Sequence, residues 1–131
     1  MKPINLTAAL AEVTEFWSPK VVGRVNDQFV KVAKLKGEFV WHKHDDEDEL
    51  FHVIKGEMTI QFENGRVAAR LTAGDIFVVP RSVMHNPVAD NECWIMLVEP
   101  VGTRHTGDLE TAMTKSIAQQ IGHMNIADNI S

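Results

Sequence analysis

The stretch WHKHDDEDELFHVIKG, residues 41–56, carries two histidines one residue apart and a glutamate five residues further on. Alternate residues of a β-strand point to the same face, so a strand here would project His42 and His44 into the same space. The acidic run that follows has turn character, which would let Glu49 return toward them on a second strand. This stretch therefore predicts a cluster of donor groups between two strands.

A second stretch, GDIFVVPRSVMHN at residues 74–86, adds a further histidine from a distant part of the chain. Imidazole is a common ligand of Fe, Mn, Ni, Cu and Zn, and a carboxylate adds negative charge. The predicted ligands of one divalent transition metal are His42, His44, Glu49 and His85. Four protein ligands leave positions open on a six-coordinate ion, which is typical of a reactive site, and the identity of the metal stays open.

The other three histidines are not expected to bind the metal. His52 alternates with Phe51 and Val53 along a predicted strand, so it should face away from the cluster. His105 lies in a loop after the last predicted core strand and is expected to be exposed. His123 lies in a weakly patterned tail.

Taken together, the two stretches resemble the two motifs of the cupin family. The first motif is matched by Gly37, His42, His44, Glu49 and Gly56, and the second by Gly74, Asp75, Pro80 and His85. The gap from the first glycine to the first histidine is one residue shorter than usual, Ser82 stands where glycine is common, and Ala89 stands where asparagine is often found. None of these departures removes a ligand, and the match covers roughly residues 35–100.

The resemblance implies an all-β fold, a double-stranded β-helix of the jelly-roll type. In metal-binding cupins the two histidines and the glutamate of the first motif, with the histidine of the second, hold the ion. Carried over to this chain, these are the same four residues that the spacing singled out. Small cupins often dimerise, so the resemblance also implies a homodimer.

The pattern along the chain agrees with a single cupin domain over residues 1–131. We expect an N-terminal helix and leading strand in 1–30, the barrel in 31–100 and a C-terminal extension in 101–131. The helix is expected over 6–16, capped by Asn5 or Thr7, and some helical character is expected over 108–121. Strands are expected at 28–35, 38–44, 49–54, 57–62, 67–71, 75–80 and 92–100.

Two hairpins are expected between these strands. Lys55, Gly56 and Glu57 are predicted to form a tight hairpin between the strands on either side of them. Asn64 and Gly65 form one of the strongest short hairpin signals, because both residues tolerate a left-handed backbone.

Composition excludes several classes of function. The chain has 131 residues, of which 44% are hydrophobic, and a net charge of −5 without a basic cluster, so nucleic acid is not an expected partner. No apolar run is long enough to cross a membrane, and the start lacks the apolar core of a secretory signal. The single Cys93 allows no internal disulfide, and a cytoplasmic location is expected.

The ligand set favours an enzyme that acts on a small oxygenated organic molecule. A dioxygenase-type reaction with Fe(II) is the leading hypothesis, and it rests on the resemblance and the ligand types. The first alternative is a Lewis-acid isomerase or lyase, such as a sugar-phosphate isomerase, with Arg81 and Arg104 as candidate phosphate ligands. The second is a metal-stabilised binding or sensor domain without turnover. The sequence identifies no catalytic acid or base.

Overall fold

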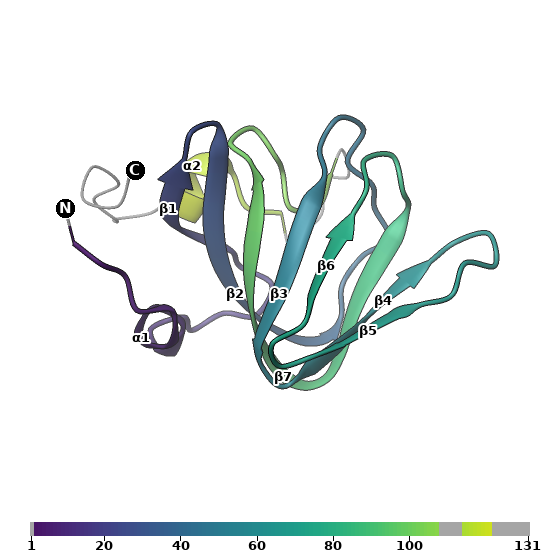
Figure 1. Ribbon diagram of the computed structural model, residues 1–131, viewed down its shortest axis with the longest axis horizontal. Coiled ribbons are helices and arrows are strands. Elements are labelled where there is room, and N and C mark those ends of the chain that lie inside the picture. Colours follow the sequence, from purple (N-terminus) through teal and green to yellow (C-terminus); the bar gives the residue numbers. More distant parts are fainter. Residues whose placement is uncertain (1, 108–113, 122–131) are drawn as a thin grey trace.

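The computed structural model describes residues 2–107 and 114–121 (Figure 1). Its elements are, in chain order, α1 (Leu6–Ala11), β1 (Lys20–Val25), β2 (Gln28–Glu38), β3 (Glu49–Lys55), β4 (Glu57–Phe62), β5 (Ala69–Thr72), β6 (Ile76–Val79), β7 (His85–Pro100) and α2 (Ile117–Ile121). The expectation for His123 and part of the helical pattern at 108–121 lie outside the described residues. None of the described helices is long and apolar enough to cross a lipid bilayer.

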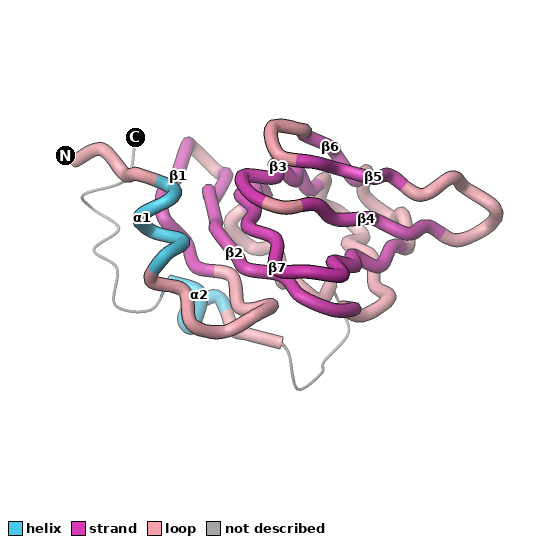
Figure 2. The backbone as a smooth tube through the Cα atoms, turned by 90° about the horizontal axis from the view of Figure 1, so that it is seen from below, coloured by secondary structure: helices cyan, strands magenta, loops and turns pink. Residues whose placement is uncertain are grey.

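The strands form one curled antiparallel sheet in the order β1-β2-β7-β3-β6, with β4 paired to both β5 and β7. The long strand β7 holds the fold together. Its second half pairs with β2 and with β3, and its first half pairs with β4 and with the end of β2. Figures 1 and 2 show the hairpin of β4 and β5 at the end opposite α1 and α2. The expected all-β jelly-roll class is confirmed.

Apolar side chains are buried on both faces of β2. Residues of the inward face, such as Ala33 and Leu35, join the main core inside the barrel. Val32, on the other face, packs with Leu10 of α1 in a second, smaller core. The helix begins as expected, with Asn5 accepting a hydrogen bond from the Ala8 backbone at 2.9 Å.

The helix is shorter than expected. It ends at Ala11 rather than near residue 16, because the following chain pairs with β2 instead. Phe16 bridges Lys34, and the Trp17 backbone N–H donates to the Lys34 carbonyl at 2.9 Å. Pairing to a strand and continuing a helix are incompatible uses of the same backbone groups.

Two other expectations about the strands are wrong. The expected strand over 38–44 does not form, because β2 has a bulge before Gly37, which has a φ of 82°, and ends at Glu38. The expected hairpin at Gly56 does not form either, since β3 pairs with β6 and β7 and not with β4. Gly56, with a φ of 83°, instead connects β3, which pairs with the second half of β7, to β4, which pairs with its first half. A Cβ at Gly56 would lie 2.7 Å from the Glu92 carbonyl oxygen.

The turn at Asn64 and Gly65 is confirmed. Both residues have a left-handed backbone, with φ values of 59° and 71°, and they connect the paired strands β4 and β5.

Candidate metal centre

Backbone pairing brings the two histidine-bearing stretches together. His42 and His85 form an isolated antiparallel bridge, with reciprocal N–H to carbonyl hydrogen bonds of 3.0 and 2.9 Å. His44 follows on the same irregular segment, Glu49 is the first residue of β3, and His85 is the first residue of β7. The irregular segment therefore does what the expected strand would have done, which is to place two imidazoles on one side of the chain.

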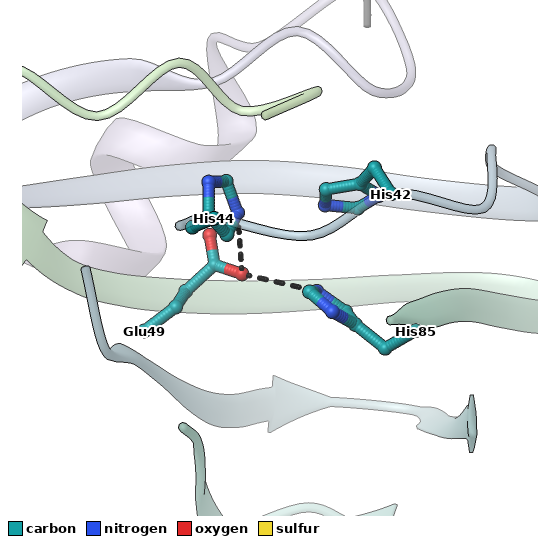
Figure 3. A group of neighbouring side chains, drawn as sticks. All are labelled: His42, His44, Glu49 and His85. Atoms are coloured by element: carbon teal, nitrogen blue, oxygen red, sulfur yellow. Dashed lines mark ion pairs between the residues drawn. The ribbon is translucent and has the colours of Figure 1, made fainter. Parts of the chain in front are cut away.

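The four side chains converge on one point. One ligand atom from each lies within 4.8 Å of all the others, and all four residues are buried. The Glu49 Oε1 atom lies 3.5 Å from Nε2 of His44 and 3.6 Å from Nε2 of His85. Figure 3 shows both imidazoles directed at this carboxylate. The four residues predicted from the sequence thus meet in space, and they could hold one metal ion.

Hydrogen bonds determine which nitrogen of two rings is available. Nδ1 of His42 lies 2.8 Å from the Val40 carbonyl, and Nδ1 of His85 lies 2.8 Å from the Val83 carbonyl. A carbonyl only accepts, so Nδ1 carries the proton in each ring and Nε2 keeps its lone pair. This arrangement is the usual way in which a protein orients a metal-binding imidazole.

Three atoms of the cluster lack hydrogen-bond partners in the part of the chain that the structure describes. Nε2 of His44, Nε2 of His85 and Oε1 of Glu49 are buried without a hydrogen bond among the described residues. Buried polar atoms are nearly always paired, because an unpaired one loses its hydration without compensation. A cation at the centre of the cluster would satisfy all three, so the residues fit a metal ion.

Burial and neighbouring charges set the protonation of the cluster. Burial, followed by the charge of His85, lowers the pKa of His42 to about 4. Burial also acts on His44, but the Glu49 carboxylate, 3.5 Å away, outweighs burial and raises the pKa of His44. Burial opposes ionisation of Glu49, yet the neighbouring imidazoles of His44 and His85, together with Glu99, hold its pKa well below the ordinary value. A metal ion would therefore compete with a proton for His44.

Two further buried side chains, Lys31 and Glu99, contact each other near the centre, and we did not predict this pair. The Nζ atom of Lys31 lies 2.8 Å from Glu99 Oε1, and both side chains are fully buried. Burial, followed by the charge of Glu49, raises the pKa of Glu99 well above its ordinary value. Lys31 lies two residues before Ala33 on the inward face of β2, and Glu99 lies two residues after Leu97 on the inward face of β7. That alternation is the signal that could have identified them.

His105 is not exposed as expected. Only 5% of its surface is accessible, and its ring stacks on Phe39 with 5.6 Å between centroids. It lines the same pocket as His42 and Glu49. The loop position alone was a poor guide, because this loop folds back over the barrel. His52, in contrast, is half-buried and lies outside the cluster, as expected.

An apolar pocket adjoins the ligands. Its free space is about 30 Å³, or about 350 Å³ when all the space between its lining atoms and its open mouth is counted, and His42, Glu49 and His105 are its ionisable lining residues. Its apolar wall includes Trp17, Leu35, Phe39, Phe51, Ile95 and Leu97. Arg81 and Arg104 are not among the lining residues. Arg104 lies in a second hollow, which is lined by the predicted ligand His44 and by the acidic residues at 45–47.

Ser82 stands where the second cupin motif commonly has glycine, and the turn before His85 still forms. Ser82 has a φ of 65°, the left-handed conformation that the more common glycine adopts easily. Its backbone N–H donates to the His44 carbonyl at 2.7 Å, and its hydroxyl donates to the Asp45 carbonyl at 3.1 Å. These bonds connect the two ligand-bearing segments.

Comparison with known proteins agrees with this geometry. The family model described as Cupin domain matches residues 28–98. Uncharacterized protein YdbB of Bacillus subtilis (strain 168) is 40% identical over 81 residues, which make up 62% of this chain and 71% of that protein.

Two solved structures are also similar. A cupin-2 domain containing protein from Shewanella frigidimarina NCIMB 400 is 41% identical, with a TM-score of 0.71 over 74% of this chain and 93% of that chain. KdgF from Halomonas sp. is 30% identical, with a TM-score of 0.53 over 63% of this chain and 78% of that chain. The matched family segment spans more than half of the sequence and contains all four clustered residues. The chain therefore belongs to the cupin family.

Proposed function

We propose that this protein is a metal-dependent enzyme of the dioxygenase type that acts on a small, largely apolar molecule carrying oxygen groups. One observation carries the proposal: four buried donor atoms converge on one point, and two of the residues that carry them, His42 and Glu49, line an apolar pocket. A structural metal site needs no such pocket, whereas a reactive one needs room for a substrate beside the ion.

The roles of the residues follow from their chemistry. Three imidazole nitrogens and one carboxylate oxygen from His42, His44, Glu49 and His85 would hold a divalent metal. This donor set suits Fe, Mn, Ni, Cu or Zn, and it leaves coordination positions free for substrate oxygens. When bound, a redox-active metal such as Fe(II) would supply Lewis acidity and activation of O₂. The apolar wall would exclude water from the reacting groups and favour a substrate with a hydrocarbon body.

The pocket argues against the sugar-phosphate isomerase. A phosphate group needs cationic or multiple N–H donors, and neither Arg nor Lys is among the residues that line the pocket. Of the two candidate arginines, Arg81 donates its backbone N–H to Asp48, and Arg104 lies in the acidic hollow. The apolar lining supports a substrate without a phosphate. A binding domain without turnover would use the same site, so only measurement of turnover separates it from an enzyme.

The first experiment is elemental analysis of protein purified without a metal-affinity tag. The proposal expects about one equivalent of a transition metal per chain, which His44→Ala should lose and the control His52→Ala should keep. The second is O₂ uptake by the Fe(II)-loaded protein with a panel of catechols, diketones and diols.

Each outcome separates the candidates. O₂ consumption with stoichiometric product, abolished in His44→Ala, would support the dioxygenase. Product formed without O₂ by the Zn- or Mn-loaded protein would refute it in favour of Lewis-acid chemistry. Binding of these compounds without product under any metal would refute catalysis.

A further inference from the structure

The loop after β7 is fixed against the metal-ligand segment. Gly107 packs on the backbone of Lys43, between two predicted ligands, and a Cβ at this glycine would overlap the Lys43 carbonyl oxygen. The Gly107 backbone N–H donates to the Arg104 carbonyl at 2.9 Å, which closes the loop into a turn. His105 lies inside this turn and is nine-tenths buried, so its position is determined by the same packing that places the ligands.

A hydrogen bond determines which nitrogen of His105 carries the proton. The backbone N–H of Lys115 donates to His105 Nε2 at 2.7 Å. A backbone N–H only donates, so Nε2 is an acceptor and a neutral ring must carry its proton on Nδ1. Burial, followed by the charge of Lys31, lowers the pKa of His105 to about 4, and the ring is therefore neutral at physiological pH. Among the described residues, the Nδ1–H group has no hydrogen-bond acceptor.

His105 is the polar side chain of the pocket that no other role occupies. Of the other lining residues with polar side-chain atoms, His42 and Glu49 are predicted metal ligands. The indole N–H of Trp17 is already bonded to the Lys36 carbonyl at 2.9 Å. A donor without an acceptor is unfavourable beside an apolar wall, and an oxygen atom of a bound molecule would satisfy it.

We propose that His105 contacts the substrate, with its Nδ1–H donating a hydrogen bond to an oxygen of a molecule held between the metal centre and the apolar wall. This inference rests on the proposed function, because it assumes that the pocket beside the metal is the substrate site. The ligand class is a small aromatic or unsaturated compound with an acceptor oxygen, such as a phenolate, an enolate or a carbonyl. Phe39, whose ring stacks against both His105 and Trp17, forms part of the apolar wall beside it.

The test measures binding of catechol to the Zn(II)-loaded protein under anaerobic conditions by titration calorimetry. Zn(II) is redox-inactive, so binding is read without turnover. His105→Phe keeps an aromatic ring on Phe39 and removes both nitrogens, whereas His105→Asn keeps an N–H donor near the position of Nδ1. His52→Phe is the matched control, since it makes the same substitution at a half-buried histidine outside the pocket.

We expect His105→Phe to weaken catechol binding about tenfold, the usual size of one lost hydrogen bond. His105→Asn should stay within about threefold of the wild type, His52→Phe should be unchanged, and all should keep the wild-type zinc content. In wild-type protein, the ¹⁵N-coupled Nδ1–H proton of His105 should move downfield when catechol binds. This NMR measurement needs no variant, so a folding defect in His105→Phe would not leave the inference untested.

Four results would overturn the inference. Equal catechol affinity in His105→Phe and wild type, or an unmoved Nδ1–H resonance on binding, would refute the role of His105 and leave the proposed function standing. A wild type that binds zinc but not catechol at millimolar concentration would refute both. A wild type that binds no metal would refute the proposed function at its first step, and the inference with it.

Discussion

Replacing His105 by phenylalanine should make the metal-free protein less sensitive to acid. Burial, followed by the charge of Lys31, lowers the pKa of this imidazole to about 4, whereas an unfolded histidine titrates near ~6.5. Between these two values the unfolded chain binds more protons than the folded chain does. The free energy of unfolding therefore falls as the pH falls through this window, and it is regained as the pH rises.

The magnitude follows from the two pKa values. At about pH 7.5 an unfolded histidine is almost entirely neutral, so His105 contributes almost nothing to the pH dependence. At about pH 5, proton linkage between a folded pKa of about 4 and an unfolded pKa of ~6.5 lowers the free energy of unfolding by about 2 kcal/mol. Phenylalanine binds no proton, so the variant should lack this loss whatever its stability at the higher pH.

The assay is urea unfolding followed by tryptophan fluorescence, with a chelator present, at both pH values. With a slope of ~1–3 kcal/mol per molar urea, a loss of about 2 kcal/mol moves the midpoint by about 1 M. His42 also has its pKa lowered to about 4 and titrates in both proteins, so the difference between them isolates His105. The reasoning is refuted if wild type and variant lose the same free energy, within about 0.5 kcal/mol, between the two pH values.

Three further predictions concern the metal centre and its surroundings. His44→Ala should weaken metal binding by more than about 100-fold in a chelator competition, because even changes to residues around the ligands cost 10–100-fold. His52→Ala should bind metal nearly as well as the wild type. A larger loss in His52→Ala than in His44→Ala would show that the strand faces are assigned wrongly. Glu99→Gln should change the free energy of unfolding in urea by less than about 1 kcal/mol. Burial, followed by the charge of Glu49, raises the pKa of Glu99, and glutamine resembles the neutral acid. A loss above about 3 kcal/mol would mean that Glu99 is ionised. Gly107→Ala should destabilise the fold by about 1–3 kcal/mol and reduce metal affinity, because its φ is 63° and its Cβ would overlap the ligand segment. Gly102→Ala, whose Cβ would meet nothing within 4 Å, is the matched control, and equal effects of the two alanines would contradict this explanation.

The candidate ligands could be predicted because metal chemistry limits the choice of side chains. Two histidines one residue apart, a glutamate and a later histidine in a second motif are enough to indicate a site before any coordinates exist. The turn at Asn64 and Gly65 was predictable for a similar reason, since the left-handed backbone is a local property of these residue types. Both predictions depend on information that lies within a few neighbouring residues.

The predictions that failed depend on distant segments. The chain from 38 to 44 has the apolar content of a strand, yet its backbone is irregular because the long strand β7 pairs with β2 and reaches this segment at His42 through a single bridge. The hairpin at Gly56 failed because β3 and β4 each found a partner elsewhere in the chain. Local turn signals cannot report which strand will be the neighbour.

Residue types at short spacings were enough to predict the family, the all-β class and the four candidate ligands. The burial of His105 beside these ligands and the contact between Lys31 and Glu99 arise only from the fold. The physical reason is that burial and protonation depend on everything that surrounds a group. For these three residues, that surrounding comes from segments far away along the chain.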